Sequence, residues 1–315
     1  MQRYSATPGS PLTGAAGRLV VVHPERRAQR SLQRLVGATL CPVEVVATLD
    51  KATIDADTIV VLDAQLAAAD LTACGRPARA WIAVPGEGLA PADPALVSTL
   101  LGAGWDHVIA HPMPLLAEEL LATAQKLILK QCFGLDKYMT WGAEVRGYQL
   151  DDAIERDAVV GAIAIDVTRV GLPDRIGSLV SVIADELLAN ALYAAPVDAE
   201  GVRFRAGDAR DKSRALVDKD VVTLRWATDG RYLAIEVRDQ WGTIDPSSIK
   251  TRLAATKTST AEGGMGLPLA YACSNQLVLN LAPSARTEVI SLLDIRYKPT
   301  ELARSASFHS FTGTL

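Results

Sequence analysis

An acid and an amide lie four residues apart in the segment SVIADELLANALYAAP, residues 181–196, which is otherwise rich in Ala, Leu and Ile. Residues four apart share one face of an α-helix, so Glu186 and Asn190 should lie one above the other. A carboxylate can take a proton from water or a hydroxyl, and an amide oxygen can bind Mg²⁺. A water-facing polar stripe on an amphipathic helix would account for the same pair.

Two glycine-containing motifs further along the chain could complete a site. Asp239 ends an apolar, strand-like run in DQWGTI, residues 239–244, and GGMGL, residues 263–267, precedes a helix-like run. A buried carboxylate is costly unless it accepts hydrogen bonds. Glycines that open a helix let backbone N–H groups approach phosphates at the positive end of the helix dipole. Each motif alone also fits an ordinary turn.

The surrounding pattern predicts which elements position these motifs. A helix is predicted over 173–196, and alternating apolar residues predict a hairpin over 221–239, turning at Asp229-Gly230. A loop rich in Ser, Thr and Lys follows, and two more strands are predicted over 276–282 and 287–295. The three motifs therefore fall on a helix, a strand end and a loop-to-helix junction.

In this order, the motifs resemble the N box (185–191), the D-x-G box (239–244) and the glycine box (263–267) of the Bergerat-fold ATPases, which include gyrase, Hsp90 chaperones and histidine kinases. The resemblance covers residues 150–295 and implies an α/β sandwich that binds ATP or ADP with Mg²⁺. It implies that Asp239 accepts the adenine amine, that Asn190 binds Mg²⁺ and that Glu186 is a catalytic base. The other implied nucleotide-binding residues are Gly242, Ile244, Gly264, Met265, Gly266, Leu267, Thr287 and Lys257.

The chain departs from the family pattern after Asn190. Tyr193 and Ala194 stand where histidine kinases often carry a basic residue. The phosphate charge would then be met by Mg²⁺, with Lys250, Arg252 or Lys257 of the lid as candidate further cations. The charged segment 197–220 is longer than compact kinases need, and we interpret it as an exposed insertion with a solvated face.

The first half of the chain alternates short β-rich runs with helical patterns, which predicts a doubly wound parallel sheet. Over residues 18–131 it resembles a response-regulator receiver domain, with Asp63 in the place of the phosphoacceptor. The expected partners are depleted, because Glu25 is the only acid after the first strand and His111 replaces the usual lysine. A pseudo-receiver that acts by contacts is the favoured interpretation. A phosphorylated receiver and a simple turn role for Asp63 are the alternatives.

These assignments divide the chain into a disordered leader (1–17), a receiver-like domain (18–131), a helical linker (132–149), an ATPase domain (150–297) and a polar tail (298–315). The last receiver helix is predicted to continue into the linker, which would couple the domains or pair two chains as a homodimer. Tyr138 and Trp141 are predicted to be packing residues. The tail is interpreted as disordered, or as a last edge strand.

Composition narrows the cellular setting. A net charge of −4 argues against a general nucleic-acid binder. The four cysteines form no C-x-x-C pair, so a reduced cytoplasm fits best. No apolar run is long enough to cross a bilayer or to serve as a signal peptide, so no membrane association is predicted.

The function predicted from these resemblances is signal transduction in a bacterium. None of the four histidines precedes the ATPase domain on a dimerisation helix, which disfavours histidine autophosphorylation. The best match is a serine/threonine kinase of the anti-sigma-factor, partner-switching type, whose partner is an antagonist or a sigma-factor-like protein. A non-catalytic, nucleotide-responsive binding module and a simple ATPase remain as alternatives.

Overall fold

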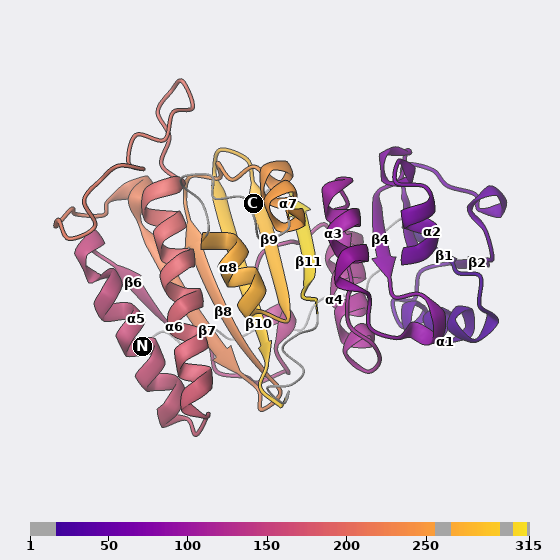
Figure 1. Ribbon diagram of the computed structural model, residues 1–315, viewed down its shortest axis with the longest axis horizontal. Coiled ribbons are helices and arrows are strands. Elements are labelled where there is room, and N and C mark those ends of the chain that lie inside the picture. Colours follow the sequence, from indigo (N-terminus) through magenta and orange to yellow (C-terminus); the bar gives the residue numbers. More distant parts are fainter. Residues whose placement is uncertain (1–16, 256–265, 297–304, 314–315) are drawn as a thin grey trace.

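A single mixed β-sheet runs through the whole molecule (Figure 1). The computed structural model describes residues 17–255, 266–296 and 305–313, and within them eleven strands lie in the order β2-β1-β3-β4-β5-β11-β9-β10-β8-β7-β6. The strands are β1 (Arg18–Val22), β2 (Val43–Val46), β3 (Thr58–Asp63), β4 (Ala80–Val84), β5 (His107–Val108), β6 (Arg146–Leu150), β7 (Val222–Thr228), β8 (Tyr232–Asp239), β9 (Gln276–Ala282), β10 (Arg286–Asp294) and β11 (Ser307–Thr312). The α-helices are α1 (Arg26–Gly37), α2 (Ala64–Ala69), α3 (Pro94–Gly102), α4 (Leu115–Leu129), α5 (Arg156–Arg169), α6 (Asp174–Ala189), α7 (Pro246–Ala254) and α8 (Gly266–Cys273).

The N-terminal half, residues 17–130, contains the predicted parallel sheet. Strands β1 to β5 pair in parallel in the order β2-β1-β3-β4-β5. Both faces are covered, because α1 and α4 pack on one side and α2 and α3 on the other. The fifth strand is shorter than the sequence suggests, since only His107 and Val108 pair with β4.

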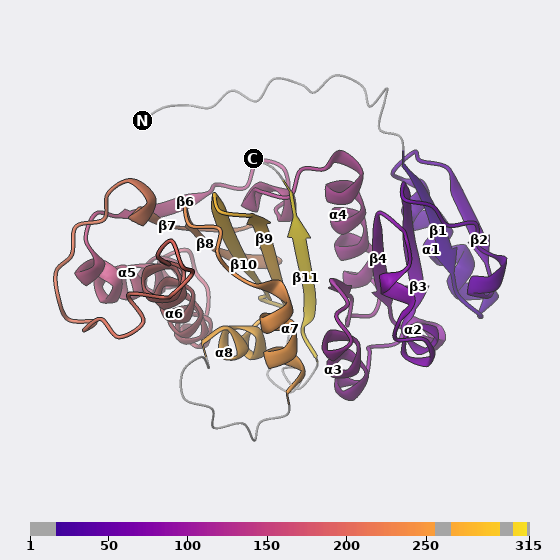
Figure 2. The same cartoon turned by 90° about the horizontal axis from the view of Figure 1, so that it is seen from above.

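The C-terminal half, residues 146–296, is an antiparallel sheet with helices on one face. The predicted hairpin of β7 and β8 turns at Gly230, whose φ of +82° suits glycine, and Asp229 accepts hydrogen bonds from the next backbone N–H groups. Helices α5, α6, α7 and α8 lie on one side of this sheet, and α3 and α2 continue the same layer (Figure 2). One apolar core therefore runs beneath helices from both halves.

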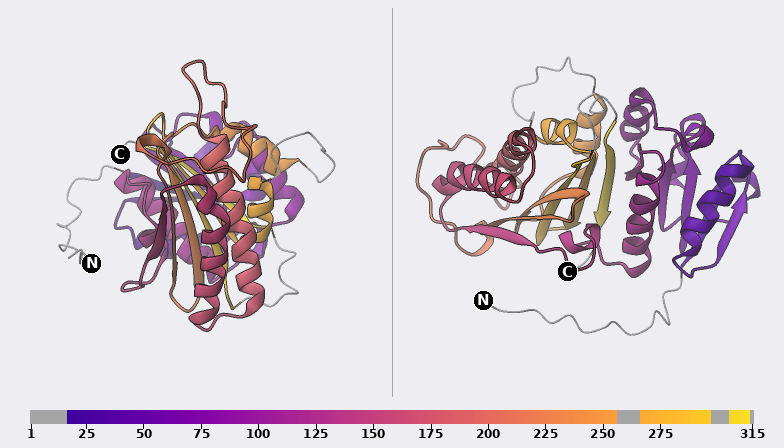
Figure 3. Two further views of the ribbon diagram at one scale, coloured as in Figure 1. Left: turned by 90° about the vertical axis from the view of Figure 1, so that its left-hand side faces the viewer. Right: turned by 90° about the horizontal axis from the view of Figure 1, so that it is seen from below.

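The two halves are joined by the C-terminal strand. Strand β11 lies parallel to β9 along its whole length and pairs antiparallel to β5 at Phe308 and His309. Figure 3 shows this strand between the two halves. The prediction of a polar tail is therefore wrong for residues 307–312. The alternative prediction of a strand there is confirmed, but the strand lies in the middle of the sheet and not at its edge. Its side chains are mostly buried, because Phe308 packs into the core beneath the helices and Phe311 packs with Leu115 and Leu135 on the other face.

The predicted helical linker over 132–149 is not a helix. Helix α4 ends at Leu129. The next residue, Lys130, adopts a left-handed φ of +55°, and Gly134 has a φ of +118°. A short 3₁₀ turn, Leu135–Tyr138, then packs on the second face of the C-terminal sheet. Tyr138 is a packing residue as predicted, since it accepts a hydrogen bond from Lys126 at 2.6 Å, but Trp141 is 98% exposed.

A buried ionic cluster fills the junction. The carboxylate of Glu119 contacts His111 Nδ1 at 3.2 Å and His309 Nε2 at 2.7 Å. Ser307 contacts the same His111 nitrogen at 3.0 Å. Burial alone would raise the pKa of Glu119, but the hydrogen bonds from the two histidines outweigh it and lower the pKa to about 2. The cluster ties α4 of the N-terminal half to β11.

Among the described residues, one helical stretch is long and apolar enough to span a bilayer, namely Asp174–Ala194, with a mean hydropathy of 1.3. It consists of α6 and its continuation. Its apolar face packs against α5, α8 and the sheet, so this stretch is a core helix.

The central position of β11 predicts a large effect for Phe308→Ala. Phe308 is fully buried between the halves, so losing its side chain should lower the free energy of unfolding by about 3–5 kcal/mol. Urea denaturation measures this change. Thr312→Ala, at the exposed end of the same strand, should change stability by no more than about 0.5 kcal/mol. A similarly small effect of Phe308→Ala would contradict the central position of β11.

Candidate functional site

Asn190 lies where the helix changes its winding. Helix α6 ends at Ala189, and Asn190–Ala194 form a π-helical turn in which Ala195 donates to the Asn190 carbonyl at 2.8 Å. Such wide turns occur often at functional sites. The Asn190 amide nitrogen donates to the Glu186 carbonyl at 2.7 Å, which fixes the side chain on the predicted face.

Asp239 ends β8 as a buried carboxyl group, with 5% of its surface exposed. Its Oδ1 accepts backbone hydrogen bonds from Trp241 at 2.8 Å and from Gly242 at 3.3 Å. Burial raises the pKa of Asp239 to about 6, against the partial compensation of these N–H groups. Its cross-strand neighbour, Thr287, is also buried, and the hydroxyl and backbone of Thr287 help to offset the rise in the pKa of Asp239. The site thus holds two polar groups able to bind a ligand.

Gly242 allows the chain to pass close to the β9–β10 turn. Its φ is +61°, and a Cβ atom there would lie 2.6 Å from the backbone nitrogen of Ala285 and 2.7 Å from that of Arg286. Its carbonyl accepts a hydrogen bond from Ser284 at 2.9 Å. Only glycine fits at this position, and the reason is backbone packing.

The structure brings the separated motifs around one small pocket of about 40 Å³. The predicted residues that line it are Asn190, Asp239, Ile244, Leu267 and Thr287. Apolar side chains from α6, α7, β8 and β10 form the rest of the wall, including Leu187, Ile249, Val237 and Val289. The pocket therefore combines apolar walls with an amide, a carboxyl and a hydroxyl group.

Glu186, a residue of α6, lies beside this pocket and close to Gly266, the first residue of α8. A Cβ atom on Gly266 would lie 2.5 Å from Glu186 Oε2 and 3.0 Å from Asn190 Nδ2, so the absence of a side chain lets α8 approach both residues. Burial raises the pKa of Glu186, Asp185 adds to the rise, and Arg210 opposes it. A raised pKa brings a carboxylate closer to the range useful for proton transfer.

The segment 197–220 brings cations to the site, a role that the sequence interpretation missed. Arg203 lines the pocket, and Phe204 packs edge-on against Trp241 with ring centroids 6.1 Å apart. The guanidinium groups of Arg210 and Arg214 lie 5.8 and 5.6 Å from the Tyr193 ring centroid. The segment is largely exposed as predicted, yet part of its charge faces the end of α6. The alternation of Arg and Phe in VRFR, residues 202–205, was the sequence signal that could have indicated this role.

The cations predicted to contact the phosphates, Lys250 and Arg252, do not both lie at the pocket. Arg252 lines the pocket, but Lys250 is buried and donates to the Gly104 carbonyl at 2.6 Å and to Asp106 at 2.8 Å, so its prediction as a phosphate contact is wrong. Lys257, Gly264 and Met265 lie outside the described residues.

Asp63 lies at the carboxyl end of β3, in the N-terminal half, and is 2% exposed. Its Oδ1 accepts the backbone N–H of Leu66 at 2.8 Å and caps α2, while its Oδ2 lies 3.4 Å from His23 Nε2. Glu25 is bound to the backbone of Gly88 at 2.8 Å, and His111 belongs to the junction cluster. The residues predicted to surround Asp63 are therefore engaged elsewhere.

No family model and no curated protein matches this chain. Within the described part of the structure, no group of three or more His, Cys, Asp or Glu side chains is placed to hold a metal ion.

The pKa of Asp239 predicts an unusual pH dependence for Asp239→Asn. Because the folded-state pKa of about 6 exceeds the ordinary 3.8, the stability contributed by the protonated carboxyl is present at low pH and is lost as the pH rises through 6. The variant avoids this loss. Its free energy of unfolding relative to the native protein should rise by about 2–3 kcal/mol between about pH 4 and pH 8 in urea titrations.

Asp245→Asn is the matched control. Asp245 caps α7, and a hydrogen bond from Ser247 lowers its pKa, so this variant should lose relative stability as the pH rises from about 3. The same pH trend in both variants would contradict the assignment for Asp239.

Proposed function

We propose that the pocket beneath α6 binds Mg-ATP and that the C-terminal half is an ATPase domain of the Bergerat type. The convergence of Asn190, Asp239 and Thr287 carries this proposal, because these residues come from three distant segments. The Asp239 carboxylate would accept a hydrogen bond from the exocyclic amine of adenine, beside the buried Thr287 hydroxyl.

The described residues fit a magnesium-bound triphosphate in their donor chemistry. Asn190 offers an amide oxygen, since its nitrogen is already used by the Glu186 carbonyl. Mg²⁺ would supply charge neutralisation on the phosphates. Arg203 and Arg252 line the pocket and would add positive charge that the helix itself lacks after Asn190.

We propose further that the protein is a serine/threonine kinase of the partner-switching type, whose partner is an antagonist or sigma-factor-like protein. Glu186 supports this choice, because it lies one turn from Asn190, beside Gly266, with a raised pKa. It would take the proton of the attacking hydroxyl. The four histidines are buried, which disfavours any of them as an acceptor.

In this proposal the N-terminal half is a pseudo-receiver. The carboxylate that would be phosphorylated caps α2 and contacts His23, and the usual lysine is His111, held by Glu119. The N-terminal half would therefore regulate the ATPase domain by contact, through the sheet that they share and the packing of their helices.

A nucleotide-responsive binding module without catalysis is the second candidate. It is favoured by α7, which lines the pocket with Ile249 and Arg252 while its Lys250 binds the N-terminal half. A nucleotide that shifts α7 would change the surface offered to a partner without any phosphoryl transfer.

Binding of Mg-ATP is the first prediction of this proposal. Calorimetric titration of the native protein should give a micromolar dissociation constant. Asp239→Asn should abolish binding, because the Asn amide would present a second donor to the adenine amine, while its stability at pH 8 should not fall. Asp245→Asn, which leaves the pocket lining intact, serves as the control. Unchanged affinity in Asp239→Asn would refute the adenine assignment.

The role of segment 197–220 gives a second prediction. Arg203→Gln should weaken ATP binding roughly tenfold through loss of a charge-assisted contact, and should leave adenosine binding unchanged. Lys212→Gln removes an exposed charge of the same segment and should alter neither affinity. Equal losses for ATP and adenosine in Arg203→Gln would indicate a structural role instead.

Transfer of radiolabel from γ-labelled ATP to a protein with a sulfate-transporter-like antagonist domain tests the kinase assignment. Glu186→Gln should abolish transfer and retain ATP binding. Binding without transfer in the native protein would favour the binding module.

A further inference from the structure

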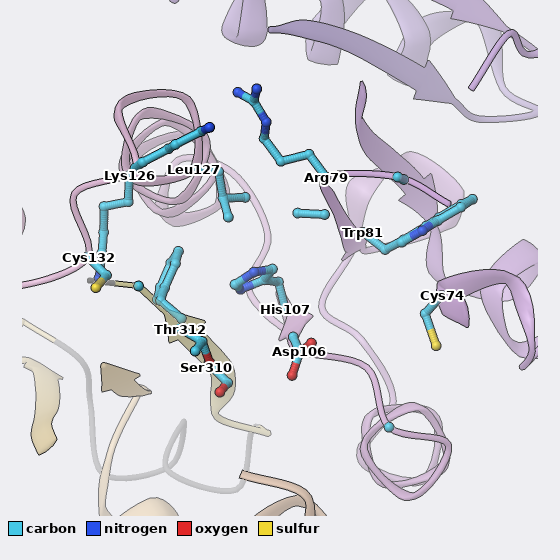
Figure 4. Close-up of a pocket in the computed structure, with 16 residues that line it drawn as sticks. Cys74, Arg79, Trp81, Asp106, His107, Lys126, Leu127, Cys132, Ser310 and Thr312 are labelled. Atoms are coloured by element: carbon cyan, nitrogen blue, oxygen red, sulfur yellow. The ribbon is translucent and has the colours of Figure 1, made fainter. Parts of the chain in front are cut away.

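A large cavity opens between the two halves, away from the nucleotide pocket. It has a volume of about 600 Å³, which falls in the range of small-molecule sites. It forms where β11 continues beyond its two paired residues with β5, so that Ser310 to Gly313 become one wall. In Figure 4, Arg79 reaches from the N-terminal sheet toward α4, and His107 points toward β11.

The lining is predominantly cationic. Arg79, Lys126 and Lys130 contribute to it, and Asp106, paired with Lys250 at 2.8 Å, is the single acidic side chain. Arg79 is itself paired with Asp57 at 2.8 Å, and burial lowers the pKa of Lys126 to about 7. Lys130 makes no ion pair within the described residues. The positive charge of Lys130 therefore favours an anion.

A buried histidine, His107, also lines this space. His107 is 3% exposed, and its Nδ1 has no hydrogen-bond partner among the described residues. Burial lowers the pKa of His107 well below its ordinary value, so the ring is neutral. Its ring lies 4.6 Å from that of Phe311, centroid to centroid, which gives the cavity an aromatic wall beside a hydrogen-bonding atom.

We propose that this cavity is a second ligand site, which binds a small organic anion. The acidic group would lie near Lys130, and the apolar part would lie against Phe311 and Leu127. A neutral imidazole nitrogen of His107 would supply the directional hydrogen bond.

One helix, α7, contacts residues around both the cavity and the proposed nucleotide pocket. Lys250 on α7 holds Gly104 and Asp106, which line the cavity, while Ile249 and Arg252 on the same helix line the pocket. Occupancy of one site should therefore change the affinity of the other. This coupling rests on the proposed nucleotide site, whereas the existence of the anion site does not.

The experiment uses the full chain and two matched probes, 1-naphthyl phosphate and neutral 1-naphthol, in fluorescence titrations without nucleotide. The phosphate should bind with one-to-one stoichiometry and the naphthol at least about tenfold more weakly. Lys130→Gln should weaken binding of the phosphate roughly fivefold, and Lys51→Gln, an exposed lysine remote from the cavity lining, should not. Thr312→Trp, which fills the cavity from an exposed position, should abolish binding.

Two results would overturn the site. One is binding that survives Thr312→Trp with the fold intact by circular dichroism. The other is binding that Asp239→Asn removes, which would place the probe in the nucleotide pocket. The coupling is measured separately, as the change in probe affinity at saturating Mg-ATP. It should disappear in Lys250→Met, and an unchanged probe affinity in the native protein would refute coupling while leaving the anion site standing.

Discussion

Strand β11 hydrogen-bonds to β5 along one edge and to β9 along the other, and the remaining architecture depends on this double pairing. Without it, each half would expose an unpaired sheet edge, which is costly in isolation and prone to mispairing. With it, the five parallel strands and the antiparallel sheet become one surface. Helices from both halves can then cover a continuous core, and α7 packs directly on α3.

The same junction concentrates charge where water is excluded. Glu119 holds His111 and His309, and Lys126 donates to Asn280 at 2.8 Å, which in turn donates to Glu288 at 2.8 Å. Groups buried in this way need their partners, because removing one leaves an uncompensated charge. The junction therefore fixes how the halves sit. Helix α7 contacts the surroundings of both spaces, because Lys250 holds Asp106 of the large cavity while Ile249 and Arg252 line the small pocket.

The pocket itself illustrates how local features combine into a site. Three features are each unremarkable in sequence, namely the π-helical turn at Asn190, the carboxyl group at the end of β8 and the threonine near the start of β10. Packed together, they place a carboxyl group, an amide and a hydroxyl in an apolar setting, where burial raises the pKa of Asp239 to about 6. Such a perturbed group in a lined pocket is the physical basis for proposing a nucleotide site.

The sequence by itself determined the elements whose signals are local. Apolar alternation and the Asp229-Gly230 turn defined the β7–β8 hairpin, and the spacing of Glu186 and Asn190 placed both residues on one helical face. Tertiary structure decided what depends on distant partners. Residues 307–312 form a central strand because they pair with two sheet edges, β5 and β9. Lys250 binds Asp106 of the N-terminal half. Arg203 lines the pocket, and its neighbour Phe204 packs on Trp241. Long-range pairing leaves no periodic mark on the chain, so polar and charged segments of this kind cannot be placed from sequence pattern alone.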